Sequence, residues 1–248
     1  MSNDVENITP FEGDQRGKTE QVRDMFDSIA PDYDFMNRAM TFGIDRWWRR
    51  KAVGMLREVP HDDILDIATG TGDLAITLAR RLSPRQVTGI DLSAEMVSIG
   101  RRKISKEGLA DTVTLGIADC LALPFADGSF DAVTCAYGVR NFADLLAGLV
   151  EMCRVLRPGG MVMILELTTP RNSLVRPLYD IYAGRIIPAI GRKVSGSDAA
   201  YSYLPASIAA VPQGPAMEAL LAEAGFTDPS TRSLTFGTCA IYTARKPM

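Results

Sequence analysis

Hydrophobic residues follow two alternating periods along the middle of the chain. Short apolar runs typical of buried strands lie at 63–68, 86–92, 112–117, 130–137 and 161–167. Between these runs, apolar positions repeat at helical spacing, most clearly at 72–82, 93–107 and 145–156. Strands that alternate with helices are typical of a mostly parallel sheet with right-handed crossovers. The pattern therefore predicts an α/β domain.

A helical arm is predicted before the first strand. Apolar residues lie at helical spacing between Val22 and Ile29, and a second helix is expected from about residue 45 to about residue 56. The arm therefore spans 21–58. The polar residues 1–20 contain no apolar segment, so we expect a flexible tail there and neither a signal peptide nor a transit peptide.

The segment 170–215 is predicted to interrupt the α/β pattern as an insertion. It holds six of the 14 prolines and four of the seven tyrosines, which does not fit another strand and helix. The core of the domain therefore covers 60–169. Beyond the insertion, 216–248 is predicted to form one last helix and a hairpin around Gly237.

Composition narrows the classes of function. The chain has 248 residues, of which 46% are hydrophobic and 23% are charged, as in ordinary globular domains. A net charge of −3 argues against a broad nucleic-acid interface. Four cysteines without a CxxC pair argue against a zinc site and indicate a reducing compartment. We therefore expect a cytoplasmic protein with no metal and no nucleic-acid partner.

The strongest chemical signal follows the first predicted strand. Asp66 lies in this strand, and Gly70-Thr71-Gly72 separates it from a predicted helix. Such a loop turns tightly and brings the backbone close to a ligand. Asp91 ends the next strand, 19 residues after Gly72, where a carboxylate can accept hydrogen bonds from both hydroxyls of a ribose. The pattern predicts a cofactor that contains a nucleoside.

Two such cofactors fit the loop. Residues 70–75 satisfy the dinucleotide pattern G-x-G-x-x-G/A, which keeps an NAD-dependent oxidoreductase as an alternative. However, Asp119 and the apolar residues that follow it could hold an adenine. The Tyr-x-x-x-Lys match from Tyr242 to Lys246 lies in a predicted strand, where the two side chains would not share a helical turn. The balance favours S-adenosylmethionine (SAM), either for catalysis or for binding alone.

The sequence resembles a known family of enzymes. Four segments, in this order, resemble the class I SAM-dependent methyltransferases: LDIATGTGDLA, GIDLSAEMVSIGRRKI, ADCLALPFADGSFD and LRPGG. Three more are similar to the menaquinone and ubiquinone biosynthesis C-methyltransferases: FDSIAPDYDFMNRAMTFGIDRWWRR, YGVRNF and YDIYAGRIIPAIGRKVSGSDAAYSYLPASI. The match covers about 22–246. It implies a single domain over 1–248 with a Rossmann-like, seven-stranded, mostly parallel sheet, an antiparallel last strand, the helical arm, and the insertion as a substrate lid.

The resemblance also implies an activity and a set of contacts. The activity is SAM-dependent C-methylation of a reduced polyprenyl quinone precursor such as demethylmenaquinol, with the benzoquinol of ubiquinone synthesis as an alternative acceptor. The residues expected to contact SAM are Tyr33, Asp66, Gly70, Thr71, Gly72, Asp91, Asp119 and Cys120. Ala68 and Ala136 depart from the pattern, because many members have glycine at the first position and some have serine at the second.

Arg140 and Asn141, in YGVRNF, are the candidate catalytic residues. A phenol titrates at about pH 10, so forming the phenolate at neutral pH costs roughly 4 kcal/mol. A nearby cation could lower the phenol pKa by about 1 to 3 units. Arg140 could supply this charge, while Asn141 orients the oxygen; the alternative role for Arg140 is a salt bridge that braces the loop. The proton acceptor stays open between water and arm carboxylates such as Asp32 or Asp34.

The arm and the insertion predict brief contact with a membrane. Between residues 171 and 198, five basic and two acidic residues give 5 − 2 = +3. Trp47 and Trp48 precede three basic residues, which is typical of a headgroup contact or of a half-buried helix. Isoleucines of the insertion could line a prenyl groove or form an ordinary lid core: Ile186, Ile187 and Ile190. We expect a polyprenyl quinol substrate, peripheral membrane association, and homo-oligomerisation as an open alternative.

Overall fold

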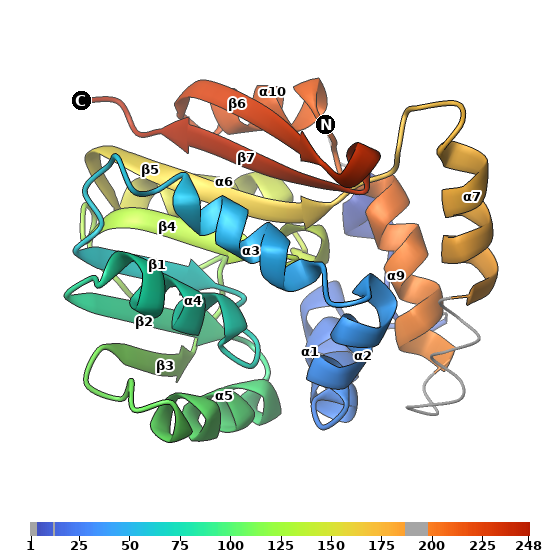
Figure 1. Cartoon of the computed structure of the whole chain (residues 1–248), viewed down its shortest axis with the longest axis horizontal. Helices are drawn as coiled ribbons and strands as arrows, with labels where there is room; N and C mark the ends of the chain where they lie inside the picture. Colours follow the sequence, from blue (N-terminus) through green and yellow to red (C-terminus); the bar gives the residue numbers. More distant parts are fainter. Residues whose placement is uncertain (1–3, 12, 187–197) are drawn as a thin grey trace.

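A single sheet of seven strands forms the centre of the computed structural model, which describes residues 4–11, 13–186 and 198–248 (Figure 1). The strands are β1 (Asp63–Ile67), β2 (Gln86–Asp91), β3 (Val113–Ile117), β4 (Phe130–Ala136), β5 (Leu156–Leu167), β6 (Thr227–Leu234) and β7 (Cys239–Arg245). Their order is β3-β2-β1-β4-β5-β7-β6. β1 to β5 pair in parallel, whereas β7 runs antiparallel to β5 and β6. The predicted sheet is confirmed.

Helices cover both faces of this sheet. One face packs against α3 (Asp45–Gly54), α4 (Asp73–Leu82) and α5 (Ala94–Lys106). The other packs against α6 (Leu145–Val155) and α10 (Pro215–Glu223). Ser93 caps α5, because its hydroxyl oxygen accepts a hydrogen bond from the backbone N–H of Met96 at 3.1 Å. α5 therefore begins at Ala94, directly after the end of β2 at Asp91.

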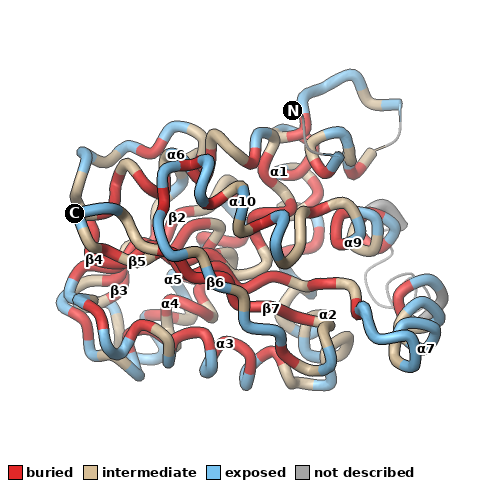
Figure 2. Tube along the Cα trace, turned by 90° about the horizontal axis from the view of Figure 1, so that it is seen from above, coloured by how far each residue is buried: buried red, intermediate tan, exposed pale blue. Residues whose placement is uncertain are grey.

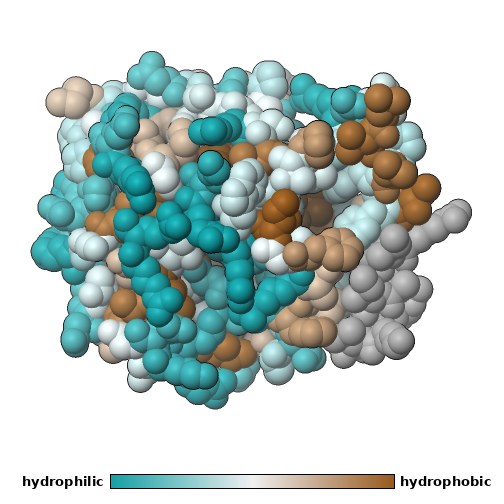
Figure 3. All heavy atoms as spheres, in the orientation of Figure 1, coloured by the Kyte–Doolittle hydropathy of each residue, from teal (hydrophilic) through white to brown (hydrophobic). Residues whose placement is uncertain are grey.

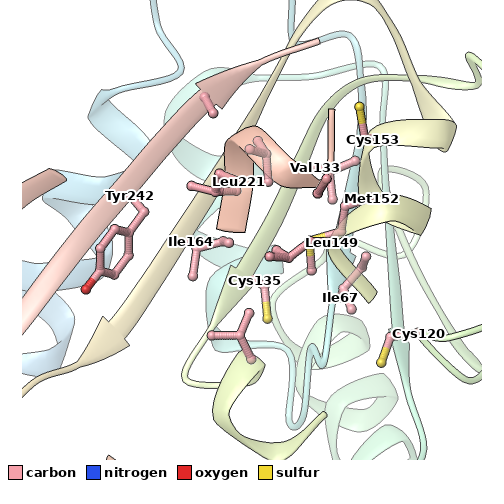
Figure 4. Packing of buried hydrophobic residues seen from close by; sticks show 14 of the residues in the cluster. Ile67, Cys120, Val133, Cys135, Leu149, Met152, Cys153, Ile164, Leu221 and Tyr242 are labelled. Carbon is pink, nitrogen blue, oxygen red and sulfur yellow. The ribbon is translucent and has the colours of Figure 1, made fainter. Parts of the chain in front are cut away.

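The core on the α6 and α10 face holds the central strands in place (Figure 4). Six of its side chains, from three strands and two helices, have no exposed surface: Ile67, Val133, Leu149, Met152, Ile164 and Leu221. Burial of an apolar side chain of this size contributes about 1.5 to 3 kcal/mol. The carboxyl ends of β1 and β4 are therefore set on a rigid base.

The arm covers the carboxyl ends of the strands through α1 (Lys18–Ile29) and α2 (Tyr33–Thr41), before α3 passes onto one face of the sheet (Figure 1). The expectation of a flexible tail over 1–20 is wrong for the described residues. Asp4–Asn7 forms a 3-10 helix in which Val5 is fully buried. A carboxylate oxygen of Glu6 accepts a hydrogen bond from the backbone N–H of Leu145 at 3.1 Å. One apolar residue in a polar segment is too weak a signal to predict this anchor.

The insertion follows β5 and contains α7 (Arg176–Ile181), the π-helical turn Tyr182–Ile186 and α9 (Asp198–Ala210). α9 lies against the arm, with Tyr201 and Tyr203 buried. α7 stands at the side of the molecule, and Figure 2 shows it largely exposed. Ile187 and Ile190 of the predicted prenyl groove lie outside the described residues. The described part contains no further strand, as the composition of the segment predicts.

Candidate active site

A cavity opens where β1, β2 and β4 end, beneath the arm. Its walls include apolar side chains such as Met96, Leu121 and Phe142. Six of the ten predicted site residues line it: Tyr33, Gly70, Asp91, Asp119, Cys120 and Asn141. These residues come from the arm, the glycine loop and the ends of β2, β3 and β4. The parallel sheet thus brings them to one edge, as their positions after successive strands predict.

Asp91 joins the glycine loop to the end of β2. Its two carboxylate oxygens accept hydrogen bonds from the backbone N–H groups of Gly70, at 2.8 Å, and Ser93, at 2.9 Å. Burial raises the pKa of Asp91 above its ordinary value. A carboxylate held by two backbone donors has a fixed orientation, and its remaining lone pairs can accept hydrogen bonds from a ligand. Asp119 is fixed similarly by the backbone N–H of Leu121 at 2.9 Å.

The glycine loop contains three residues with positive φ: Ala68 at 53°, Gly70 at 55° and Gly72 at 81°. Alanine is rarely found in this region, which favours glycine. Gly138 makes room for the Ala68 side chain, because a Cβ at position 138 would lie 2.6 Å from the Cβ of Ala68. Gly72 is the N-cap residue of α4, and a Cβ there would face Ile104 and Leu115 at 3.6 Å. The tight turn and the packing around α4 are enough to explain why residue 72 is a glycine, so this glycine is not evidence for a bound ligand.

Two predicted contacts lie beside a smaller cavity, whose lining includes Asp66 and Thr71. The hydroxyls of Thr69 and Thr134 donate to the buried carboxylate of Asp66 at 2.6 and 2.7 Å. The hydroxyl of Thr71 instead donates to Asp34 of the arm at 2.6 Å, and Lys103 Nζ donates to the other Asp34 oxygen at 2.6 Å. Thr71 and Asp34 therefore join the arm to the glycine loop.

Replacing Asp66 with asparagine is expected to stabilise the fold above about pH 6. Burial raises the pKa of Asp66 to about 6, whereas an unfolded aspartate titrates near about 3.9. Between these values the native state binds the extra proton, so the free energy of unfolding falls as the pH rises through this window. A shift of about 2 units corresponds to roughly 3 kcal/mol as an upper bound.

Urea unfolding between about pH 4 and about pH 8 measures this effect. Asp66→Asn should match the native chain at the acid end and exceed it at the alkaline end. Asp127→Asn is a control, because this side chain is 77% exposed, pairs with Arg154, and precedes β4 at the edge of the sheet opposite the loop. Parallel stability curves for the native chain and Asp66→Asn would show that burial does not perturb Asp66.

A second cavity of about 250 Å³ adjoins the first beneath the arm and the insertion. The two cavities share Tyr33 and Tyr137 in their linings. Most of the wall of the second cavity is apolar, with side chains from the arm, β5 and α9: Met40, Ile44, Trp48, Leu167, Leu204 and Ile208. The sequence did not predict this cavity, because its wall combines segments that are far apart along the chain.

Trp47 and Trp48 have different environments. The Trp48 indole N–H donates to the hydroxyl of Thr235 at 2.8 Å, and the residue is buried. Trp47 is exposed beside Lys51, whose Nζ lies 5.6 Å from the ring centroid. The predicted headgroup contact is therefore wrong for Trp48, which lines the apolar cavity instead.

Arg140 lines the apolar cavity and is 6% exposed. One terminal guanidinium nitrogen donates to Glu166 Oε1 at 2.8 Å and also to the backbone oxygen of Tyr137. The salt bridge that the sequence left as an alternative therefore exists, with Glu166 as a partner that no motif indicated. The Nε of Arg140 has no partner among the described residues. Arg140 can thus brace its loop and still donate one hydrogen bond to a ligand.

Unpaired polar atoms gather around the cavities. Five buried side-chain polar atoms have no hydrogen-bond partner within the described part of the chain. Four of them are Tyr137 OH, Arg140 Nε, Asn141 Oδ1 and Tyr203 OH. Tyr137, Arg140 and Asn141 each line one or both of the two cavities, and Tyr203 lines a further small cavity between the arm and α9 that Arg140 and Asn141 also line. Buried polar groups are normally hydrogen-bonded, so this cluster indicates a polar ligand.

Tyr137 and Tyr203 are site residues that the sequence interpretation missed. Tyr137 has a positive φ of 59°, which is unusual for an aromatic residue and is found at functional sites. The Arg49 guanidinium lies 5.5 Å from its ring centroid. Tyr137 is part of YGVRNF, so the motif contains this residue but does not indicate its role.

His61 lies before β1, and its Nδ1 is 2.6 Å from the backbone oxygen of Val59.

Comparisons with known proteins found similar sequences over nearly the whole chain. A model described as the ubiE/COQ5 methyltransferase family matches residues 14–246. Demethylmenaquinone methyltransferase of Bacteroides fragilis is 47% identical over 246 residues, covering 99% of this chain and 100% of that protein. The ubiquinone/menaquinone biosynthesis C-methyltransferase UbiE of Geobacter sulfurreducens is 46% identical over 230 residues, covering 92% and 90% respectively.

A solved structure shares the fold at low sequence identity. Phosphoethanolamine N-methyltransferase 2 of Haemonchus contortus, in complex with S-adenosyl-L-methionine, has a TM-score of 0.58 and 17% identity. The similarity covers 87% of this chain and 60% of that chain.

Proposed function

The chain belongs to the ubiE/COQ5 methyltransferase family, and we propose that it transfers the methyl group of SAM to a ring carbon of a polyprenyl quinol. Demethylmenaquinol is the proposed acceptor, in line with the name of the Bacteroides fragilis relative. The observation that carries this proposal is the meeting of two cavities at Tyr33 and Tyr137. One has acidic residues suited to a nucleoside, and the other is mostly apolar with two arginines, Arg49 and Arg140, in its wall.

The residues of the first cavity fit SAM. Asp91 would accept hydrogen bonds from the ribose hydroxyls, and Asp119 with its apolar neighbours would hold the adenine. Asp66 and the smaller cavity would face the positively charged methionine part. Tyr33 would close over the ligand, because its ring edge lies 3.9 Å from the position that a Cβ of Gly70 would take. When bound, SAM supplies an electrophilic methyl group with its own leaving group.

The competing oxidoreductase hypothesis lacks a second catalytic group. Tyr242 is almost fully buried and lies among the core side chains in Figure 4. Its hydroxyl oxygen accepts a hydrogen bond from the backbone N–H of Gly214 at 3.1 Å. The Tyr242 and Lys246 match therefore lies in the hairpin rather than at the cofactor cavity.

Arg140 and Asn141 are the proposed residues that activate the acceptor. Loss of a proton from a ring hydroxyl makes the adjacent ring carbon nucleophilic, and a neighbouring cation favours the phenolate. The free Nε of Arg140 can donate to this oxygen, and the free Oδ1 of Asn141 can accept from a ring hydroxyl. Tyr137 OH supplies a further donor or acceptor at the boundary of the two cavities.

The proposed substrate has an apolar tail, so we also propose that the protein visits a membrane surface. No helix within the described ranges is both long and apolar enough to span a bilayer. The sequence predicts this contact for the basic residues of the insertion. Arg176 pairs with Asp180 at 2.7 Å, and Arg192 and Lys193 lie outside the described residues.

A methyl-transfer assay tests the proposed activity. The chain should transfer labelled methyl from SAM to reduced demethylmenaquinone, more slowly to a demethylated benzoquinol, and not to the oxidised quinone, whose ring carbon is electron-poor. Calorimetry should show binding of SAM and no comparable binding of NAD. Binding of SAM without transfer to either reduced acceptor would contradict the proposed function.

A further inference from the structure

A group of large apolar side chains is exposed at one side of the molecule. We call this group the apolar rim, and its members are between 52% and 86% exposed: Phe42, Leu174, Leu178, Ile181 and Phe236. Leu178 and Ile181 are three residues apart on α7 and so share one of its faces, and Leu174 lies in the turn just before this helix. Apolar side chains gather over α7 in Figure 3. A contiguous exposed apolar surface indicates an interaction site.

The rim is assembled from three segments that are distant in the sequence. Phe42 follows α2, and its ring centroid lies 6.4 Å from that of Tyr182, just after α7. Phe236 lies in the turn between β6 and β7, beside Thr235, which accepts the hydrogen bond from Trp48. These contacts tie the arm to the insertion on one side and to the hairpin on the other.

Two members of the rim are held in an unfavourable backbone conformation. Phe42 has a φ of 51° and Phe236 a φ of 56°. Phe42 takes this conformation as the C-cap of α2, and Phe236 takes it in the tight turn between β6 and β7, so the backbone turns fix where both rings emerge. Both side chains are nevertheless at least 80% exposed, so core packing does not account for them.

The rim surrounds an entrance to the apolar cavity. Phe42 belongs to both the rim and the cavity wall. The cavity wall also contains direct sequence neighbours of Leu178, Ile181 and Phe236, namely Tyr179, Tyr182 and Thr235. The charged residues between 38 and 51 that are exposed are all basic: Arg38, Arg46, Arg50 and Lys51. The one acid of that segment, Asp45, is buried against Arg49. The exposed charge on this stretch of the arm, which continues from Phe42 into α3, is therefore entirely basic.

We infer that the apolar rim inserts into the headgroup region of a lipid bilayer, so that an apolar tail passes from the lipid into the cavity without crossing water. This inference rests on the proposed function for its substrate. Exposed apolar side chains together with exposed basic residues are the composition expected of a bilayer contact. The continuity of the rim with the substrate cavity favours a bilayer over a second copy of the chain, which would close the entrance.

Vesicle co-sedimentation without SAM or quinol tests the rim. The native chain should bind mixed phosphatidylcholine and phosphatidylglycerol vesicles, and more weakly vesicles of phosphatidylcholine alone. The triple variant Leu174→Ser, Leu178→Ser, Phe236→Ser should bind the mixed vesicles about a hundredfold more weakly, because each lost side chain contributes about tenfold or less when partly inserted. Val150→Ser is the matched control, since Val150 is 45% exposed on α6, away from the entrance.

A second measurement separates this inference from the proposed function. The triple variant should methylate a short-tailed quinol in solution at the native rate, and a long-tailed quinol in vesicles much more slowly. If the native chain binds vesicles, the triple variant does not, and the native chain methylates neither acceptor, the result would support the rim and contradict the proposed function. Equal vesicle binding by the native chain and the triple variant would overturn the inference. The inference would also be overturned if the native chain bound neither kind of vesicle. If the triple substitution then only dissociated a dimer in sedimentation velocity, the rim would be a contact between two copies of the chain.

Discussion

Arg140→Met is expected to reduce the turnover of quinol methylation about ten- to a thousandfold, because a cation lowers the pKa of a nearby phenol by about 1 to 3 units. Each unit changes the phenolate fraction at neutral pH about tenfold. The affinity for SAM should change little, since the Arg140 side chain lines the apolar cavity rather than the cofactor cavity. The pH profile of kcat measures the effect, and the variant should recover part of its rate as the pH rises.

The same substitution should also destabilise the fold, because Glu166 would be buried without its partner. Breaking a buried ion pair costs about 3 to 5 kcal/mol. The double variant Arg140→Met, Glu166→Gln removes both charges and serves as the matched control. It should regain most of the free energy of unfolding, measured in urea, without regaining turnover. Recovery of both would show that Arg140 only braces the loop, and would contradict its proposed role in activating the acceptor.

Asp91→Ala is expected to weaken SAM binding about ten- to a hundredfold, because a hydrogen bond to a carboxylate contributes about 1.5 to 3 kcal/mol. Removal of the carboxylate also leaves the backbone N–H groups of Gly70 and Ser93 without their acceptor. Titration calorimetry with SAM and with S-adenosylhomocysteine measures the change. Both ligands carry the same ribose, so both should lose affinity by a similar factor.

Asp91→Asn separates the two roles of this side chain. It keeps one acceptor oxygen for the loop, so the fold should be less affected than in Asp91→Ala, while the affinity for SAM still falls. Asp127→Ala, at an exposed and distant carboxylate, should leave the affinity unchanged. Native affinity in a folded Asp91→Ala variant would exclude Asp91 from the cofactor site.

Sequence reasoning placed the predicted cofactor-binding residues at one edge of the sheet, and there is a physical reason that it could do so. Asp91 and Asp119 each follow a strand whose apolar run is visible in the sequence. In a parallel sheet all such strands end at the same edge, so chain order is enough to bring these residues together. The glycine loop could be predicted likewise, because positive φ at Gly70 and Gly72 is a local property of the backbone.

The same reasoning did not identify the partners of site residues. Thr71 was expected to contact the cofactor, yet its hydroxyl donates to Asp34, 37 residues earlier. Arg140 was left between two roles, and only the structure brings Glu166, 26 residues later, within hydrogen-bond distance. Many carboxylates in the chain could have paired with either residue, and their distances depend on how the helices and strands pack.

The sequence by itself therefore determined the class of fold and the nucleoside character of the cofactor, and it predicted the edge of the sheet for the proposed site. These follow from periodicity and chain order. The tertiary structure alone decided that Trp48 is buried while Trp47 is exposed, that Leu178 lies on an exposed rim, and that an apolar cavity adjoins the cofactor cavity. The hydrophobic effect is not directional, so an apolar residue shows that burial is favourable but not which surface will provide it.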